Sequence, residues 1–220
     1  TPTGNHPRCA AKLHARPPSA SVQALLASLP WEGETMQRTY GIRSGFLGGL
    51  GGRDALHRLL FEPTVTIDGL LSGYTGPGSK TVIPAQAMAK LDIRLTPDLT
   101  PQLAYQLLRD HLRRRGFEDI EVVDLQDGLM PARTAPEALI ARAVADALQD
   151  AGGIAPVIYP TAAGSGPMYE LCQAYGVGVA SAGAGWYGSR AHAPDESIRV
   201  ADFVESVKFA GRLLQRFSEA

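Results

Sequence analysis

The 220-residue sequence lacks the features that define several large classes of protein. No apolar run approaches the ~18 residues that a membrane-spanning helix needs, and the first fifteen residues have no apolar core of a signal peptide. The 21 Lys and Arg residues balance 22 Asp and Glu residues, so no positive excess favours nucleic acid or an anionic membrane. Two cysteines, Cys9 and Cys172, cannot form a disulfide framework. We therefore expect a globular cytoplasmic protein that binds neither nucleic acid nor a membrane.

The sequence also lacks the short motifs of most hydrolases. It contains no H-E-x-x-H, no H-x-D, no C-x-x-C and no adjacent pair of glutamates. Metal-assisted hydrolysis needs several ligands and a general base for the bound water. No catalytic residue is therefore identifiable in this chain from its motifs.

The first part of the chain has the pattern of an α+β fold. Residues 64–70 and 87–96 are typical of strands, and the second alternates apolar and polar side chains, as half-buried antiparallel strands do. Thr100 is suited to cap a helix that Gly116 ends. Residues 118–125 resemble a further strand. This order predicts part of an α+β plait, with helices on one face of an antiparallel sheet.

The pattern changes near Pro131. A helix is expected over 137–150, and residues 157–159 and 177–182 are continuous apolar runs of the kind found in buried strands. The last helix carries an apolar stripe at helical spacing, formed by Phe203, Val207, Ala210, Leu214 and Phe217. Alternation of helices with apolar strands predicts a doubly wound α/β domain after residue 131.

Two residues in the later part are candidates for chemistry. His192, in SRAHAPDE, follows an apolar strand and is either a metal ligand or an ordinary loop histidine; one histidine alone cannot hold zinc. Ser165, in TAAGSGPM, precedes a helix and either binds a carboxylate or oxyanion there or simply caps its turn. The residues alone leave both choices open.

Two further candidates lie in the earlier part. Arg94 projects from the polar face of its strand, where it either captures a substrate carboxylate or forms a salt bridge on a solvated face. Thr81, in SKTVIP, lies in a long loop rich in glycine and proline, and it would cap a turn if it had no other role.

Three segments taken together, in this order and spacing, resemble the zinc aminoacylase/carboxypeptidase family of metallopeptidases. They are GPGSKTVIPAQAMAKLDIRL (76–95), PTAAGSGPM (160–168) and SRAHAPDESI (189–198). The family includes carnosine dipeptidases, acetylornithine deacetylase and succinyl-diaminopimelate desuccinylase, and the similarity is closest to its dipeptidase branch.

The resemblance implies a catalytic α/β domain that holds two zinc ions, and a smaller α+β plait lid that forms a homodimer. By this resemblance His192 corresponds to the last zinc ligand, and Arg94 to the lid arginine that binds the substrate's carboxylate. Thr81 corresponds to a lid residue of the same pocket, and Ser165 to the serine beside that carboxylate.

The resemblance also implies a division of the chain. Residues 16–131 correspond to the later part of the lid and residues 132–220 to the C-terminal part of the catalytic domain, whereas residues 1–15 match nothing and are expected to be disordered or artefactual. The family's remaining zinc ligands and its general base have no counterpart here. We therefore expect a C-terminal fragment, arising from truncation, a frameshift or a split gene.

The resulting expectation is a C-terminal portion of a zinc exopeptidase or amidohydrolase that acts on small peptides or N-acyl amino acids. Such a portion is expected to be inactive without the N-terminal half. The alternative is a non-enzymatic module for dimerisation or assembly, in which an exposed strand edge of the lid docks onto another chain.

Overall fold

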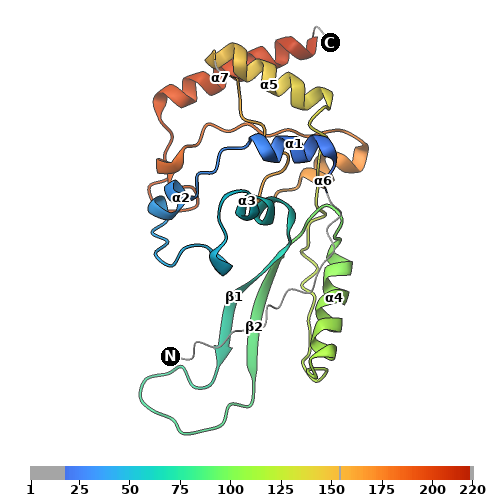
Figure 1. The fold of residues 1–220 in the computed structure, drawn as a ribbon. Coiled ribbons are helices and arrows are strands. Elements are labelled where there is room, and N and C mark those ends of the chain that lie inside the picture. The colour runs from blue at the N-terminus through green and yellow to red at the C-terminus, as the bar shows by residue number, and fades with distance from the viewer. Residues whose placement is uncertain (1–17, 154, 219–220) are drawn as a thin grey trace. The chain divides into compact units, whose positions relative to one another are not determined.

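The structure is a computed structural model that describes residues 18–153 and 155–218 (Figure 1). The expectation for residues 1–15 lies outside the described residues. The elements, in chain order, are α1 (Ala20–Ser28), α2 (Gly33–Thr39), η1 (Leu47–Gly49), α3 (Gly52–Phe61), β1 (Thr64–Ser72), β2 (Ala87–Arg94), α4 (Pro101–Arg114), α5 (Leu139–Gly152), α6 (Met168–Leu171), η2 (Gln173–Tyr175), η3 (Tyr187–Ser189) and α7 (Val200–Ser218). This mixture of helices with one small antiparallel sheet is an α+β arrangement, as expected.

The described residues fall into two compact units. The first unit is Phe61–Pro131, and the second joins the described parts of Pro17–Leu60 and Ala132–Ala220. The two units therefore separate after Pro131, and residues before α3 group with the later part of the chain. The assignment of 16–131 to a lid and of 132–220 to a catalytic domain stays a prediction, because compactness alone does not identify a domain.

An antiparallel ribbon of β1 and β2 forms the sheet of the first unit. Thr64 pairs with Arg94 at one end and Ser72 with Ala87 at the other, and a bulge lies between Ile67 and Gly69. Both predicted strands are confirmed. The expected burial of one face is not observed, since Leu70 on β1 is 75% exposed and most of β2 is also open to solvent.

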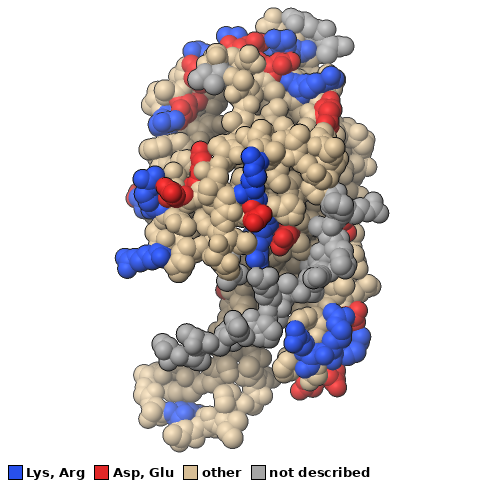
Figure 2. All heavy atoms as spheres, in the orientation of Figure 1, with Lys and Arg blue, Asp and Glu red and all other residues tan. Residues whose placement is uncertain are grey.

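Helix α4 begins as its sequence predicts. The side chain of Thr100 accepts a hydrogen bond from the Leu103 backbone N–H (3.2 Å), and Pro101 occupies the first turn, where no N–H is needed. Gly116 follows the helix with a φ of 78°, a left-handed conformation that favours glycine. Positive charge gathers over the carboxyl end of α4 (Figure 2), where it complements the helix dipole.

The first helices of the second unit contribute much of its buried apolar surface. Ser19 caps α1, since its hydroxyl accepts a hydrogen bond from the Val22 N–H (3.4 Å). Val22 of α1 and Leu56 and Leu60 of α3 are buried. The guanidinium of Arg53, on α3, donates a hydrogen bond to the Ala27 carbonyl of α1.

Helices α5 and α7 pack against each other along the second unit (Figure 1). Val144 and Ala147 of α5 are buried, and Gly153 ends that helix in a left-handed conformation. An ion pair between Arg216 Nη2 and Asp150 Oδ2 (2.5 Å) joins the two helices. Both helices were predicted from their apolar spacing.

Three predicted strands are wrong. Residues 118–125, 157–159 and 177–182 belong to no sheet among the residues that the structure describes. A strand exists only where a neighbouring strand accepts and donates its backbone hydrogen bonds, and apolar composition does not supply that neighbour. The doubly wound sheet expected after residue 131 is correspondingly not assembled within the described part of the chain.

None of the helices in the described ranges is both long enough and apolar enough to cross a membrane.

Candidate functional site

The four candidate residues are divided between the two units. Thr81 and Arg94 belong to the first unit, whereas Ser165 and His192 belong to the second. Each pair is therefore described within its own unit.

Arg94 occupies the last position of β2. Its Nε lies 2.7 Å from Asp92 Oδ2 on the same face of the strand, and the two side chains are 55% and 38% exposed. The salt bridge that the sequence offered as one alternative is therefore present. It does not bury the guanidinium, which stays accessible to a ligand with a carboxylate.

Thr81 lies in the exposed connection between β1 and β2, beyond the end of the ribbon that is opposite Arg94 (Figure 1). At the usual rise of a strand, Ala87 and Arg94 are about 23 Å apart. Within the connection, the Tyr74 hydroxyl donates to the Pro77 carbonyl (3.0 Å), and Lys80 Nζ lies 5.4 Å from the Tyr74 ring centroid. The structure therefore does not bring Thr81 and Arg94 together within one chain.

Ser165 lies in an exposed turn shortly before α6. The helix has four residues, and its N-cap is Pro167, which makes no side-chain capping hydrogen bond. Ser165 thus precedes the helix by more than one residue, and so short a helix does not by itself make an anion site.

His192 lies in a tightly closed loop. The Ser197 N–H donates to the Ser189 carbonyl (3.0 Å), which closes the loop at its base. Within it, Arg190, His192 and Asp195 all have φ between 55° and 62°. Non-glycine residues reach this left-handed region only at a cost of about 1–2 kcal/mol each, so the surrounding contacts must hold the loop.

Several contacts hold the loop of His192. The His192 N–H donates to Glu196 Oε2 (3.4 Å), and Arg190 forms an ion pair with Asp195 (3.3 Å). Ser189 is buried, and its hydroxyl accepts a hydrogen bond from the Trp186 N–H (2.9 Å). These contacts form only in the folded loop and leave no recognisable pattern in the sequence.

A second group supports the same segment at the start of α7. The Arg199 guanidinium lies 4.9 Å from the Trp186 ring centroid and donates to both Asp202 oxygens, one at 2.9 Å. The hydrogen bond to Asp202 raises the pKa of Arg199 above its ordinary value. Sequence reasoning missed these residues, because an arginine that stacks on a tryptophan lies at no fixed distance from it in the sequence.

The described residues do not by themselves make a metal centre. Within 18–153 and 155–218, no three His, Cys, Asp or Glu side chains are placed so that they could hold a metal ion. Zinc takes three or four protein ligands, so His192 and the described residues around it are too few ligands to hold the ion by themselves.

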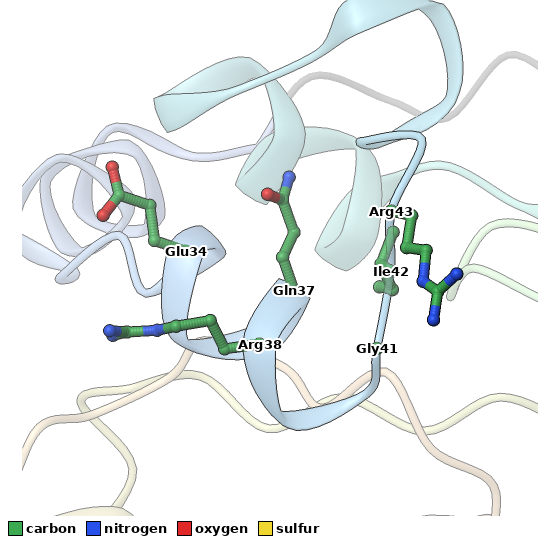
Figure 3. Close-up of a pocket in the computed structure, with 6 residues that line it drawn as sticks. All are labelled: Glu34, Gln37, Arg38, Gly41, Ile42 and Arg43. Carbon is green, nitrogen blue, oxygen red and sulfur yellow. The ribbon is translucent and has the colours of Figure 1, made fainter.

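The structure also has a shallow pocket of ≈ 400 Å³ that the sequence did not predict (Figure 3). It lies at the end of α2 in the second unit and is lined by Glu34, Gln37, Arg38, Gly41, Ile42 and Arg43. The charged side chains in Figure 3 point away from one another, so they do not converge on a ligand. None of the four candidate residues lines this pocket.

Comparison with known proteins finds one family match, a peptidase dimerisation domain of M20 peptidases, over residues 11–120. A Beta-Ala-His dipeptidase of Rattus norvegicus is 32% identical over 83 residues, which is 36% of this chain and 17% of the relative.

Solved structures are similar over most of the chain. The M20 family metallo-carboxypeptidase Sso-CP2 from Sulfolobus solfataricus matches with a TM-score of 0.82 and 30% identity, over 94% of this chain and 47% of that one. The di-peptidase Dug1p from Saccharomyces cerevisiae has the same fold (TM-score 0.76, 22% identity), over 94% of this chain and 43% of that one. The chain thus spans less than half the length of each of these relatives.

Proposed function

The chain belongs to the M20 peptidase family, and we propose that it is part of a zinc-dependent exopeptidase or amidohydrolase that cleaves small peptides or N-acyl amino acids. The observation that carries this proposal is the match to Sso-CP2, a metallo-carboxypeptidase, at 30% identity over 94% of the chain. Family membership supports metal dependence, and zinc is our choice of metal. A cytoplasmic location is part of the same proposal.

In this proposal Arg94 and Ser165 bind the free carboxylate of the substrate. The exposed guanidinium at the end of β2 supports this role for Arg94, because a strand mounts it rigidly and leaves it open to a ligand. Binding of a terminal carboxylate would restrict cleavage to the ends of chains. His192 would be one metal ligand, and the loop that fixes its backbone supports that role, because metal ligands must be held in place.

The proposal also includes a homodimer that the lid forms. The matched family is a dimerisation domain, which supports this assembly. Thr81 and Arg94 lie toward opposite ends of one ribbon, so a shared pocket requires Thr81 from one copy and Arg94 from the other. The partner copy would in this way contribute to the substrate pocket.

We further propose that the 220 residues alone do not hydrolyse substrate. The lack of a metal cluster among the described residues supports this, since water activation in this family needs one. A second candidate function, a non-enzymatic assembly module, is favoured by the exposed apolar side chains of β1, of which Ile67 and Leu70 are 64% and 75% exposed.

A chimera tests the proposed function. Residues 18–218 would replace the matched part of the Sulfolobus solfataricus enzyme, and hydrolysis of dipeptides and N-acyl amino acids would be measured with and without a chelator. We expect chelator-sensitive hydrolysis. A folded, metal-loaded chimera without hydrolysis would favour the assembly module instead.

The role of Arg94 gives a sharper prediction in the same chimera. Arg94→Ala is expected to lower kcat/KM for substrates with a free carboxylate by about 10–100-fold, the value of a lost charged hydrogen-bond pair. Esterified substrates should lose far less. Asp92→Asn is the control, because it removes the neighbouring charge and keeps the guanidinium. Equal losses for both kinds of substrate would exclude Arg94 as the carboxylate anchor.

A further inference from the structure

We infer that Trp186 and Arg199 are positioning residues for His192, because together they join the two ends of the loop that carries this histidine. The loop spans 190–196, between η3 and the start of α7. The inference rests on the proposed function only in treating His192 as a residue of the site. All the contacts that support it lie within the second unit.

Two contacts join the ends of the loop. In the inner contact, the Ser197 N–H donates to the Ser189 carbonyl (3.0 Å). In the outer contact, the Arg199 guanidinium lies 4.9 Å from the centroid of the Trp186 ring. Both contacts link the stretch before the loop to the stretch after it. The loop is therefore closed twice, once by a backbone hydrogen bond and once by a cation–π contact.

Trp186 is fixed on its own side of the loop. Its N–H donates to the buried Ser189 hydroxyl (2.9 Å), and its carbonyl accepts from the Ser189 N–H (2.9 Å). Its ring lies over Gly188, where a Cβ would overlap Cζ2 and Cη2 of the indole. The φ of Gly188 is not positive, so glycine is needed here for space rather than for backbone conformation. The backbone around the ring therefore leaves room for it in this one place.

Arg199 is fixed on the other side by helix α7. Its guanidinium donates to both carboxylate oxygens of Asp202, in the first turn of the helix, and one of these bonds measures 2.9 Å. Its carbonyl accepts from the Phe203 N–H (3.0 Å). A bidentate pair orients a guanidinium as well as holding it. The 19-residue helix therefore sets the position of the cation that contacts Trp186.

The loop between these ends depends on them. His192 has a φ of 62°, a conformation that a non-glycine residue keeps only where surrounding contacts determine it. The hydrogen bond from its N–H to Glu196 is long at 3.4 Å. The ion pair of Arg190 with Asp195 is exposed and therefore contributes little. Because these contacts inside the loop are weak, the contacts at its base must supply the rest.

Amide hydrogen exchange of the full 220-residue chain tests the inference without metal or substrate. Arg199→Met removes the cation and should speed exchange at 190–197 about two- to fivefold, the value of a cation–π contact at an exposed site. Trp186→Leu should speed it roughly tenfold or more, since it also removes the ring from Gly188. The double variant should exchange no faster than Trp186→Leu, because both changes break the same contact.

Lys208→Met is the matched control. Lys208 also forms an ion pair three residues away on α7, with Glu205 (2.7 Å), but it lies more than two turns beyond Arg199. Its loss should leave exchange at 190–197 unchanged. Gly188→Ala displaces the ring without removing it, so it should also speed exchange and replaces Trp186→Leu if that variant does not fold.

NMR of the same variants measures the conformation of His192 itself. At positive φ the amide and α protons of one residue lie close together, so His192 should give a strong nuclear Overhauser effect between them. This signal should weaken in Trp186→Leu and in Arg199→Met, and it should persist in Lys208→Met. A role confined to the stability of the whole unit would leave the signal of the folded protein unchanged.

Three results would overturn the inference. They are exchange at 190–197 that Arg199→Met changes no more than Lys208→Met does, effects that add in the double variant, and faster exchange that extends equally through α5 and α7 with an unchanged His192 signal. Hydrolysis is not measured, so the two proposals fail separately. An inactive chimera whose loop keeps these contacts would refute the proposed function and leave the positioning role in place.

Discussion

At the residue scale, the unusual feature of this protein is backbone conformation rather than side-chain chemistry. Three residues of one short loop, Arg190, His192 and Asp195, have positive φ, and none of them is glycine. Their sequence pattern identified His192 as a candidate but gave no indication of its conformation. The reason is physical: the left-handed turn depends on the bonds that Ser189 and Glu196 make, which are properties of the folded loop.

The loop yields a prediction at Asp195, whose side chain is 85% exposed and forms an ion pair across the loop with Arg190. Asp195→Val should lower the free energy of opening of the loop by about 1–2 kcal/mol relative to Asp195→Gly, because a β-branched residue is strained at positive φ. Both variants lose the same ion pair, so they form a matched comparison. Amide hydrogen exchange over 190–197 measures the effect. Equal exchange in the two variants would show that the loop does not hold this conformation in solution.

At the element scale, the helices were predictable and several strands were not. Helices α4, α5 and α7 satisfy their backbone hydrogen bonds internally, so local signals such as Thr100 and Gly116 were sufficient. The predictions of β1 and β2 were correct because each of these strands supplies the backbone hydrogen-bond partners of the other. Residues 177–182 have the composition of a strand but no neighbour in the described chain, and no local signal reports a missing neighbour.

The two faces of α7 give a prediction at the same scale. Leu213→Ala should lower the free energy of unfolding of the chain by about 1–2 kcal/mol, because Leu213 is half-buried on a helix that packs against α5. Leu214→Ala, one position along the helix and 73% exposed, should change it by less than about 0.5 kcal/mol. Urea unfolding of both variants measures the difference. A larger loss from Leu214→Ala would contradict the assignment of the faces.

At the scale of the whole molecule, the sequence predicted the family more fully than it predicted the architecture. Arg94, Ser165 and His192 were selected through three motifs that share one family, and comparison confirms that family. Thr81 lies in the first of these motifs as well, but its distance from Arg94 could not be derived from the motif. A motif records which residues occur together in a sequence, whereas the ribbon separates Thr81 from Arg94 in space.

The proposed dimer gives a prediction for mixed assemblies of the chimera. Arg94→Ala and Thr81→Ala are each expected to be nearly inactive when pure. A reassorted equal mixture should recover about a quarter of the activity, because half of its dimers are hybrids and each hybrid has one intact site. Steady-state rates before and after reassortment measure this recovery. No recovery would mean that Thr81 and Arg94 act in the same copy, or that Thr81 is not part of the pocket.

The central proposal is that this chain supplies part of the lid and part of the site of an M20 metallopeptidase, and that its 220 residues do not form the metal centre by themselves. The most direct measurement is the zinc content of the purified 220-residue chain after dialysis, beside that of the chimera. We predict far less than one zinc ion per chain for the 220 residues and near-stoichiometric zinc for the chimera. Two zinc ions retained by the 220-residue chain alone would contradict the claim.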